Sequence, residues 1–193
     1  YAAGLALALP GGSARFEALA GDLEKRFPED TFVKFTYAPV VRALALQGKG
    51  KFADSIERLE ITRTYEFAVN GLNFPYLNLG GLHSAYVRGL AFMAERRSVD
   101  AETEFQKILN HRGLVGLDPI GALAHLQLGR AFELSGDKMK AKAAYEAALS
   151  RLDEVTQALE QPLPIEDRSD PTSIHFDPPT DPPATTSHRR PAS

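Results

Sequence analysis

The sequence contains no cysteine, and this absence removes several classes of structure. Disulfide frameworks, cysteine-ligated zinc or iron–sulfur sites and cysteine nucleophiles all require that residue. A basic excess is also missing, since 22 basic side chains face 25 acidic ones, giving a net charge of −3. Nucleic-acid-binding proteins carry a positive excess that displaces counterions from phosphate. We therefore expect no nucleic-acid partner and a domain that a hydrophobic core stabilises.

The N-terminal apolar run, residues 1–9, has too few residues to cross a membrane. A helix that spans a bilayer needs about 20 apolar residues. A secretory signal would also carry a basic region before its apolar stretch, and none is seen here. We interpret the run as a helix from a longer protein and expect no direct membrane insertion by this chain. The compartment stays open: cytoplasmic, or periplasmic if the parent protein has an upstream membrane span.

The C-terminal segment differs sharply in composition from the rest of the chain. Residues 162–193 hold 8 of the 13 prolines and few apolar side chains. Such a segment buries too little surface to offset the entropy lost on ordering. We therefore expect two parts, a helical-repeat domain over residues 1–160 and a disordered, proline-rich tail over residues 161–193.

A repeated pattern of small and aromatic residues organises the first part. Its clearest copy contains Gly129, Phe132, Gly136, Ala141 and Tyr145. With Gly129 at position 8, these residues fall at positions 8, 11, 15, 20 and 24 of a tetratricopeptide (TPR) repeat, a helix–turn–helix unit. The small residues let two helices approach closely, and the glycine at position 15 ends the first helix in a left-handed turn.

The same pattern fits three more times along the chain. Its anchors are Gly89, Ala43 and Gly4, at intervals of 40, 46 and 39 residues counted back from the first copy. Arg96 stands at the turn position of the copy anchored at Gly89. The longest connector, residues 62–82, contains both chain-breaking and aromatic residues, so we expect it to be ordered and to fold back over the helices.

The predicted fold is all-α, a TPR helical-hairpin solenoid of about four repeats. No segment alternates convincingly between polar and apolar residues as a strand would. Glycine and proline positions mark the helix ends. The predicted helices span residues 1–9, 13–26, 35–47, 51–61, 83–95, 99–110, 119–134 and 138–158.

Several ordered stretches resemble one particular group of proteins. Residues 18–31, 85–89, 104–113 and 118–124 are similar to the C-terminal TPR region of eukaryotic-like serine/threonine protein kinases and related signalling proteins of Acidobacteria. The resemblance implies a parent protein with an N-terminal effector, a kinase or a winged-helix DNA-binding domain, often followed by a membrane span.

Motifs for catalysis are missing from the chain. There is no glycine-rich phosphate loop and no HExxH metal pair, and the stretch His111–Gly113 lacks the aspartate of a kinase catalytic loop. We predict a non-enzymatic module that binds protein, part of a larger bacterial signalling protein, without cofactor or metal. The alternatives are a fragment of a serine/threonine kinase whose catalytic domain is absent here, and a self-association domain that forms a homo-oligomer.

The inner positions of the first helix in each repeat define a candidate groove for a protein or peptide. The leucines at these positions are expected in the core, because apolar stripes at helical spacing are usually buried; they are Leu44, Leu90, Leu123 and Leu126. For Tyr37, Tyr86 and Arg130, binding and packing remain equally weighted alternatives, since Tyr and Arg also dominate binding interfaces. The candidate groove residues are Tyr37, Gln47, His83, Tyr86, Met93, Arg130 and Glu133.

Two arginines stand where the repeat usually has leucine. These are Arg42 and Arg88, both at repeat position 7. A buried arginine without a partner costs several kcal/mol. We therefore predict that each meets a carboxylate or free helix carbonyls and has a structural role.

Overall fold

The computed structural model describes residues 13–68 and 81–160. Regular structure in these ranges is entirely helical, which confirms the all-α class. The chain divides into two units, Tyr1–Glu160 and Gln161–Ser193, and every described residue belongs to the first. The helix predicted at 1–9 and the predicted proline-rich tail lie outside the described residues.

Most helix boundaries agree with the sequence pattern to within a residue or two. Two predicted helices differ in kind, because residues 35–47 begin with a π-helical turn and residues 51–61 end in a 3-10 helix. The short helix α7 was not predicted. The elements are α2 (Ser13–Arg26), η1 (π, Val33–Tyr37), α3 (Ala38–Gly48), α4 (Phe52–Leu59), η2 (3-10, Glu60–Tyr65), α5 (Leu82–Ala94), α6 (Ser98–Asn110), α7 (Arg112–Val115), α8 (Ile120–Ser135) and α9 (Lys138–Glu160).

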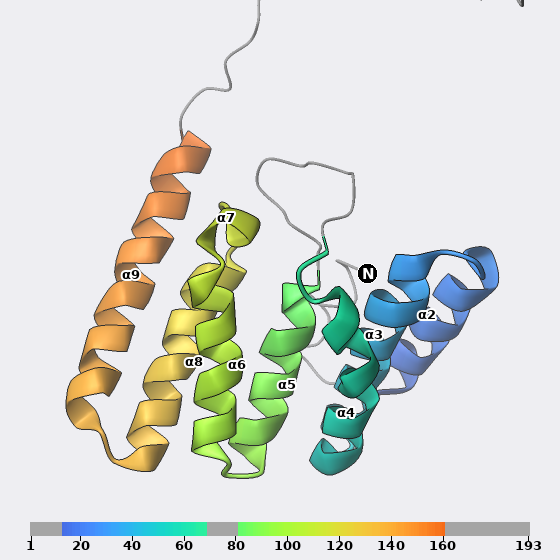
Figure 1. The fold of residues 1–193 in the computed structure, drawn as a ribbon, viewed down its shortest axis with the longest axis horizontal. Helices are drawn as coiled ribbons and strands as arrows, with labels where there is room; N and C mark the ends of the chain where they lie inside the picture. Colours follow the sequence, from blue (N-terminus) through green and yellow to red (C-terminus); the bar gives the residue numbers. More distant parts are fainter. Residues whose placement is uncertain (1–12, 69–80, 161–193) are drawn as a thin grey trace, which may run out of the picture. The chain divides into compact units, whose positions relative to one another are not determined.

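The described helices lie side by side in chain order, from α2 at one end to α9 at the other (Figure 1). Each long helix packs against the next: α2 on α3, α3 on α4, α4 on α5, α5 on α6, α6 on α8 and α8 on α9. Packing between sequence neighbours is what short, tight connections favour. None of the described helices is both long enough and apolar enough to span a bilayer.

The tight turns of three hairpins share one backbone geometry. Gly50, Arg96 and Gly136 lie at the same repeat position and have positive φ values of 72°, 57° and 85°. After each first helix, the same two backbone hydrogen bonds close the turn, as in Arg96 N–H to the Met93 carbonyl and Arg97 N–H to the Phe92 carbonyl. This is the Schellman ending of a helix. The left-handed turn predicted at Gly136 is confirmed.

Close approach of paired helices explains two further glycines. A Cβ at Gly89 would lie 2.5 Å from a ring carbon of Phe105, and one at Gly129 would lie 2.4 Å from a ring carbon of Tyr145. Both glycines therefore let an aromatic ring from the second helix of the hairpin pack against the first. The spacing between glycine and ring is the same in the two hairpins, as the sequence pattern predicts.

The described part of the 62–82 connector folds back on the helices as expected. Tyr65 stacks on Phe35 with ring centroids 5.1 Å apart, and Phe67 stacks on His111 at 4.2 Å. Residues 69–80 lie outside the described residues.

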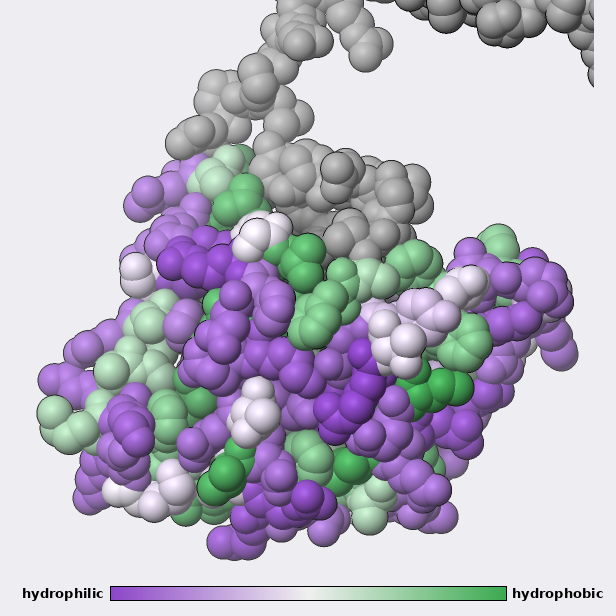
Figure 2. All heavy atoms as spheres, in the orientation of Figure 1, coloured by the Kyte–Doolittle hydropathy of each residue, from purple (hydrophilic) through white to green (hydrophobic). Residues whose placement is uncertain are grey.

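The face shown in Figure 2 is largely hydrophilic, with hydrophobic residues in small separate groups.

A buried ion network joins this connector to α5 and α6. The Arg88 side chain is fully buried; it donates to the Leu59 carbonyl (2.8 Å) and to Glu66, and its Nε lies 3.0 Å from Glu104 Oε1. The Lys107 ammonium contacts the same two carboxylates at 2.8 and 2.9 Å. The structural role predicted for Arg88 is confirmed, with both carboxylates and a helix carbonyl as partners.

The network keeps the Glu104 carboxylate charged. Burial raises its pKa, but hydrogen bonds and charges from Arg88 and Lys107 outweigh that effect, so the pKa lies below its ordinary value of 4.5. A carboxyl group whose pKa falls on folding stabilises the fold above its unfolded pKa. That stabilisation is lost as the pH falls through the lower, folded value.

Arg42 makes a more exposed version of the same contact. Its guanidinium donates to both carboxylate oxygens of Glu24, at 2.6 and 2.7 Å, and Glu17 lies 3.6 Å away. The Arg42 side chain is 30% exposed. This arginine is therefore only partly buried, unlike a residue of the core. The predicted carboxylate partner is confirmed.

Candidate functional site

A depression of about 500 Å³ lies where the end of α5 meets the end of α8. Met93, Arg130 and Glu133 line it, together with Arg96 and Leu134. The first three belong to the predicted groove, and two different helices bring them together. Arg96 comes from the left-handed turn that ends α5. The site combines apolar side chains with two guanidinium groups and one carboxylate.

Hydrogen bonds connect Arg130 to the core. Its guanidinium donates to the Gln127 Oε1 at 3.4 Å, and the Gln127 amide donates to the Tyr86 hydroxyl at 3.3 Å. The Tyr86 ring packs at 5.9 Å from Phe105, and burial raises the pKa of its hydroxyl. Tyr86 therefore positions Gln127 and Arg130, and its own ring is largely in the core.

Glu133 is held from the second helix of its hairpin. The Tyr145 hydroxyl donates to the Glu133 Oε2 at 2.8 Å. Burial and the bond to this carboxylate raise the pKa of Tyr145. Because the Glu133 side chain is held toward α9, the exposed Arg130 beside it keeps unused hydrogen-bond donors of its fork-shaped guanidinium.

One side of α8 extends the site along the helix. Leu123 and Leu134 are 42% and 38% exposed, and Leu126 and Arg130 lie between them at spacings of three and four residues. Residues at such spacings share one face of a helix. Leu44 is buried, as expected of the groove leucines, but the expectation was wrong for Leu123, which the structure leaves half in solvent.

The remaining groove candidates lie elsewhere. Tyr37 packs on the cluster around α2 and α3 and stacks with Phe32 at 5.8 Å between ring centroids. The Gln47 amide donates to the Ser55 hydroxyl at 3.0 Å and to the Val87 carbonyl at 2.8 Å, so it joins α3, α4 and α5. These contacts give both residues a packing role.

His83 contacts the loop before α8. Its Nε2 lies 3.5 Å from Oδ2 of Asp118, whose Oδ1 accepts the Ile120 N–H at the start of that helix. His83 therefore joins α5 to the beginning of α8. It does not line the depression beside Met93.

Sequence reasoning missed the lining residues Ala94, Arg96 and Leu134, and Gln127 behind them. Arg96 carried a signal, because it occupies the turn position at which the other hairpins have glycine. Leu134 carried none, since an exposed leucine late in a helix follows the same spacing as a buried one. No cluster of three His, Asp or Glu suited to a metal occurs among the residues that the structure describes.

Comparisons with known proteins give this chain no relative. No protein-family model, curated protein or solved structure matches it.

Proposed function

We propose that residues 13–160 are a TPR-type helical-repeat module that binds a peptide segment of another protein, without catalysis, on the surface formed by α5 and α8. The observation that carries this proposal is the gathering of Met93, Arg130 and Glu133 around one depression. Arginine is among the residue types that carry most of the binding energy in protein interfaces, and Met93 places an apolar contact beside it.

Equivalent positions in successive hairpins support the TPR assignment. The left-handed turns at Gly50, Arg96 and Gly136 follow the anchors of three successive copies by the same interval. Gly89 and Gly129 each meet an aromatic ring at the same separation in sequence. A repeat protein of this kind binds ligands along the helices that line one side of the stack. Following the resemblance in sequence, we further propose that this module is part of a larger bacterial signalling protein.

The preferred ligand is a short extended segment with an acidic and an apolar residue. Arg130 and Arg96 outnumber the single carboxylate of Glu133, so an acidic side chain is favoured over a basic one. Met93 and Leu134 offer the apolar contact. Methionine suits such a site because its flexible side chain adapts to different partners.

A peptide selection tests the proposal. A random peptide library is selected against the full chain, and enriched peptides are measured for affinity with the wild type, Arg130→Ala and Arg58→Ala. Arg58 is an exposed arginine of α4, away from the depression, and serves as the matched control. We expect Arg130→Ala to weaken binding about ten-fold, as the loss of an interface arginine does. Peptides that bind all three proteins equally would contradict the proposed surface.

A further inference from the structure

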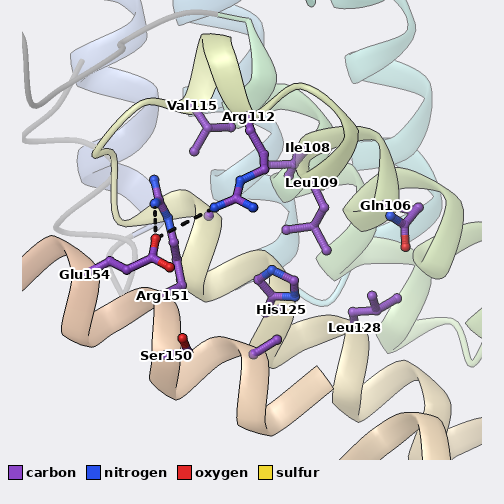
Figure 3. Close-up of a pocket in the computed structure, with 12 residues that line it drawn as sticks. Gln106, Ile108, Leu109, Arg112, Val115, His125, Leu128, Ser150, Arg151 and Glu154 are labelled. Carbon is purple, nitrogen blue, oxygen red and sulfur yellow. Dashed lines mark hydrogen bonds and ion pairs between the residues drawn. The ribbon is translucent and has the colours of Figure 1, made fainter. Parts of the chain in front are cut away.

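A second cleft lies between the C-terminal helices, separate from the α5–α8 depression. It encloses about 430 Å³ and is bounded by α6, α7, α8 and α9 (Figure 3). This volume falls within the range of small-ligand sites. Leu109 and Leu128 provide apolar wall, and the two pockets share no lining residue.

Charged groups collect at one side of this cleft. Arg151 donates to Glu154 Oε2 at 2.6 Å and to the Gly116 carbonyl, which fixes its guanidinium beside α7. Arg112 lies 3.7 Å from the same Glu154 oxygen and keeps 77% of its side-chain exposure. Two guanidinium groups thus face one carboxylate, a surplus of one positive charge. Because Arg112 makes a single long contact, most of its donors remain available.

His125 projects from α8 into the cleft, to one side of the charged group (Figure 3). Among the described residues, none forms a hydrogen bond or ion pair with its imidazole. Burial, followed by the charges of Arg112 and Arg151, lowers its pKa, while Glu154 raises it to a smaller extent. The imidazole is therefore neutral at pH 7, half-buried, and free to donate or accept.

We propose that this cleft binds a carboxylate attached to an apolar side chain, the chemistry of a C-terminal leucine or of a free acylated amino acid. The surplus of one positive charge matches the single charge of a carboxylate, and Arg112 offers the planar fork that binds it in a bidentate manner. His125 supplies a further hydrogen bond from the floor. Leu109 and Leu128 contact the apolar side chain.

The distribution of roles between the two arginines follows from their contacts. Arg151 maintains the cleft, since its bond to the Gly116 carbonyl connects α9 to the end of α7 and its bond to Glu154 holds the guanidinium along α9. Arg112 is the residue whose loss leaves that framework in place. The proposal is independent of the peptide surface on α5 and α8.

Titration of His125 by NMR provides the test. The full-length chain is titrated with pH, alone and with millimolar N-acetyl-leucine, and the His125 signal is assigned with a His125→Gln variant. We expect the bound carboxylate to raise the pKa of His125, because a nearby anion favours the charged imidazole. N-acetyl-leucine amide, which lacks the charge, leaves it unchanged. Inorganic phosphate, which lacks the apolar group, binds more weakly than N-acetyl-leucine.

Variants and a peptide complete the experiment. Arg112→Ala weakens N-acetyl-leucine about ten-fold, as the loss of a bidentate charged contact does, and Arg58→Ala leaves the affinity unchanged. An acetylated tetrapeptide ending in a free leucine carboxylate tells the two sources apart: if it binds, the site accepts a peptide C-terminus, and if only N-acetyl-leucine binds, the ligand is a free acid. The proposal is overturned if neither probe moves the His125 titration, if the amide or phosphate binds equally well, or if both arginine variants weaken binding alike.

Discussion

Replacing Arg88 by methionine is the change that most directly challenges the packing of this fold. Arg88→Met keeps much of the side-chain volume but leaves the buried carboxylates of Glu66 and Glu104 facing each other, each 3% exposed. Lys107 remains near both of them, at 2.8 and 2.9 Å. Removing one partner of a buried ion network costs about 3–5 kcal/mol. This is a large share of the roughly 5–15 kcal/mol by which domains are stable.

Urea unfolding of the full chain at pH 7, followed by circular dichroism, measures this cost. With a urea dependence of about 1–3 kcal/mol per molar, the midpoint falls by roughly 1–5 M while the slope stays constant. The triple variant Arg88→Met, Glu66→Gln, Glu104→Gln serves as the comparison. It removes the guanidinium and both buried carboxylates together and leaves the Lys107 ammonium, whose side chain is 19% exposed, without a charged partner in the network. We therefore expect it to recover part of the lost stability.

The stability difference between wild type and Arg88→Met also depends on pH. Without the guanidinium, only Lys107 offsets the burial of Glu104, so the pKa of this carboxyl rises and the variant gains stability relative to wild type as the pH falls and the group takes up a proton. The difference therefore narrows between pH 7 and pH 5. A single variant that loses less than about 1 kcal/mol at pH 7, the range typical of surface pairs, would refute the reasoning, since Lys107 would then suffice to balance both carboxylates.

Further predictions concern the turns, the helix crossings and acid stability. Gly89→Ala places a Cβ 2.5 Å from Phe105 and is expected to cost about 1–3 kcal/mol in thermal or urea unfolding. Gly136→Ala, at φ 85°, is expected to destabilise the fold by about 1 kcal/mol, whereas Arg96→Gly, at φ 57°, is expected to stabilise it or to be neutral. If both variants shifted the unfolding midpoint in the same direction, the shared turn geometry would be contradicted. As the pH drops below about 4.5 and Glu104 is protonated, the wild type loses unfolding free energy. In Glu104→Gln, the unfolding free energy changes less with pH over the same range.

The hairpins were predictable because their contacts are local and repeat in the sequence. A glycine followed at a fixed distance by an aromatic residue predicts the close crossings at Gly89 and Gly129, and the structure has both. Arg96 occupies the turn position of its copy, and the structure gives it a positive φ of 57° there although arginine itself is unsuited to it. A repeated pattern of this kind indicates the backbone conformation at a turn, and the residue at that position adopts it even when its side chain disfavours it.

The candidate site was less predictable, for reasons that particular residues show. The π-turn over Val33–Tyr37 inserts a residue relative to an α-helix, so a groove position counted at regular helical spacing is displaced at Tyr37. Gln47 and His83 are engaged by partners far along the chain, Val87 and Asp118, which no local pattern reveals. Such contacts depend on how successive hairpins pack.

The cleft between α6, α7, α8 and α9 could not be predicted from the sequence for the same reason. Arg112 belongs to the short helix α7, which has too few residues to produce a periodic signal. Its meeting with Arg151 and His125 depends on the packing of α6, α8 and α9. His125 lies within α8, and no motif around it in the sequence marks it for a role.

The two methionines of the chain allow the peptide surface to be tested directly. Met93 lines the α5–α8 depression, and Met139, 79% exposed on α9, lies outside it. Carbon-13 labelling of the methionine methyl groups gives two NMR signals that respond to ligand independently. On addition of a selected peptide, the account predicts that the Met93 signal shifts with saturation while that of Met139 stays in place. A shift of Met139 with Met93 unchanged would contradict it.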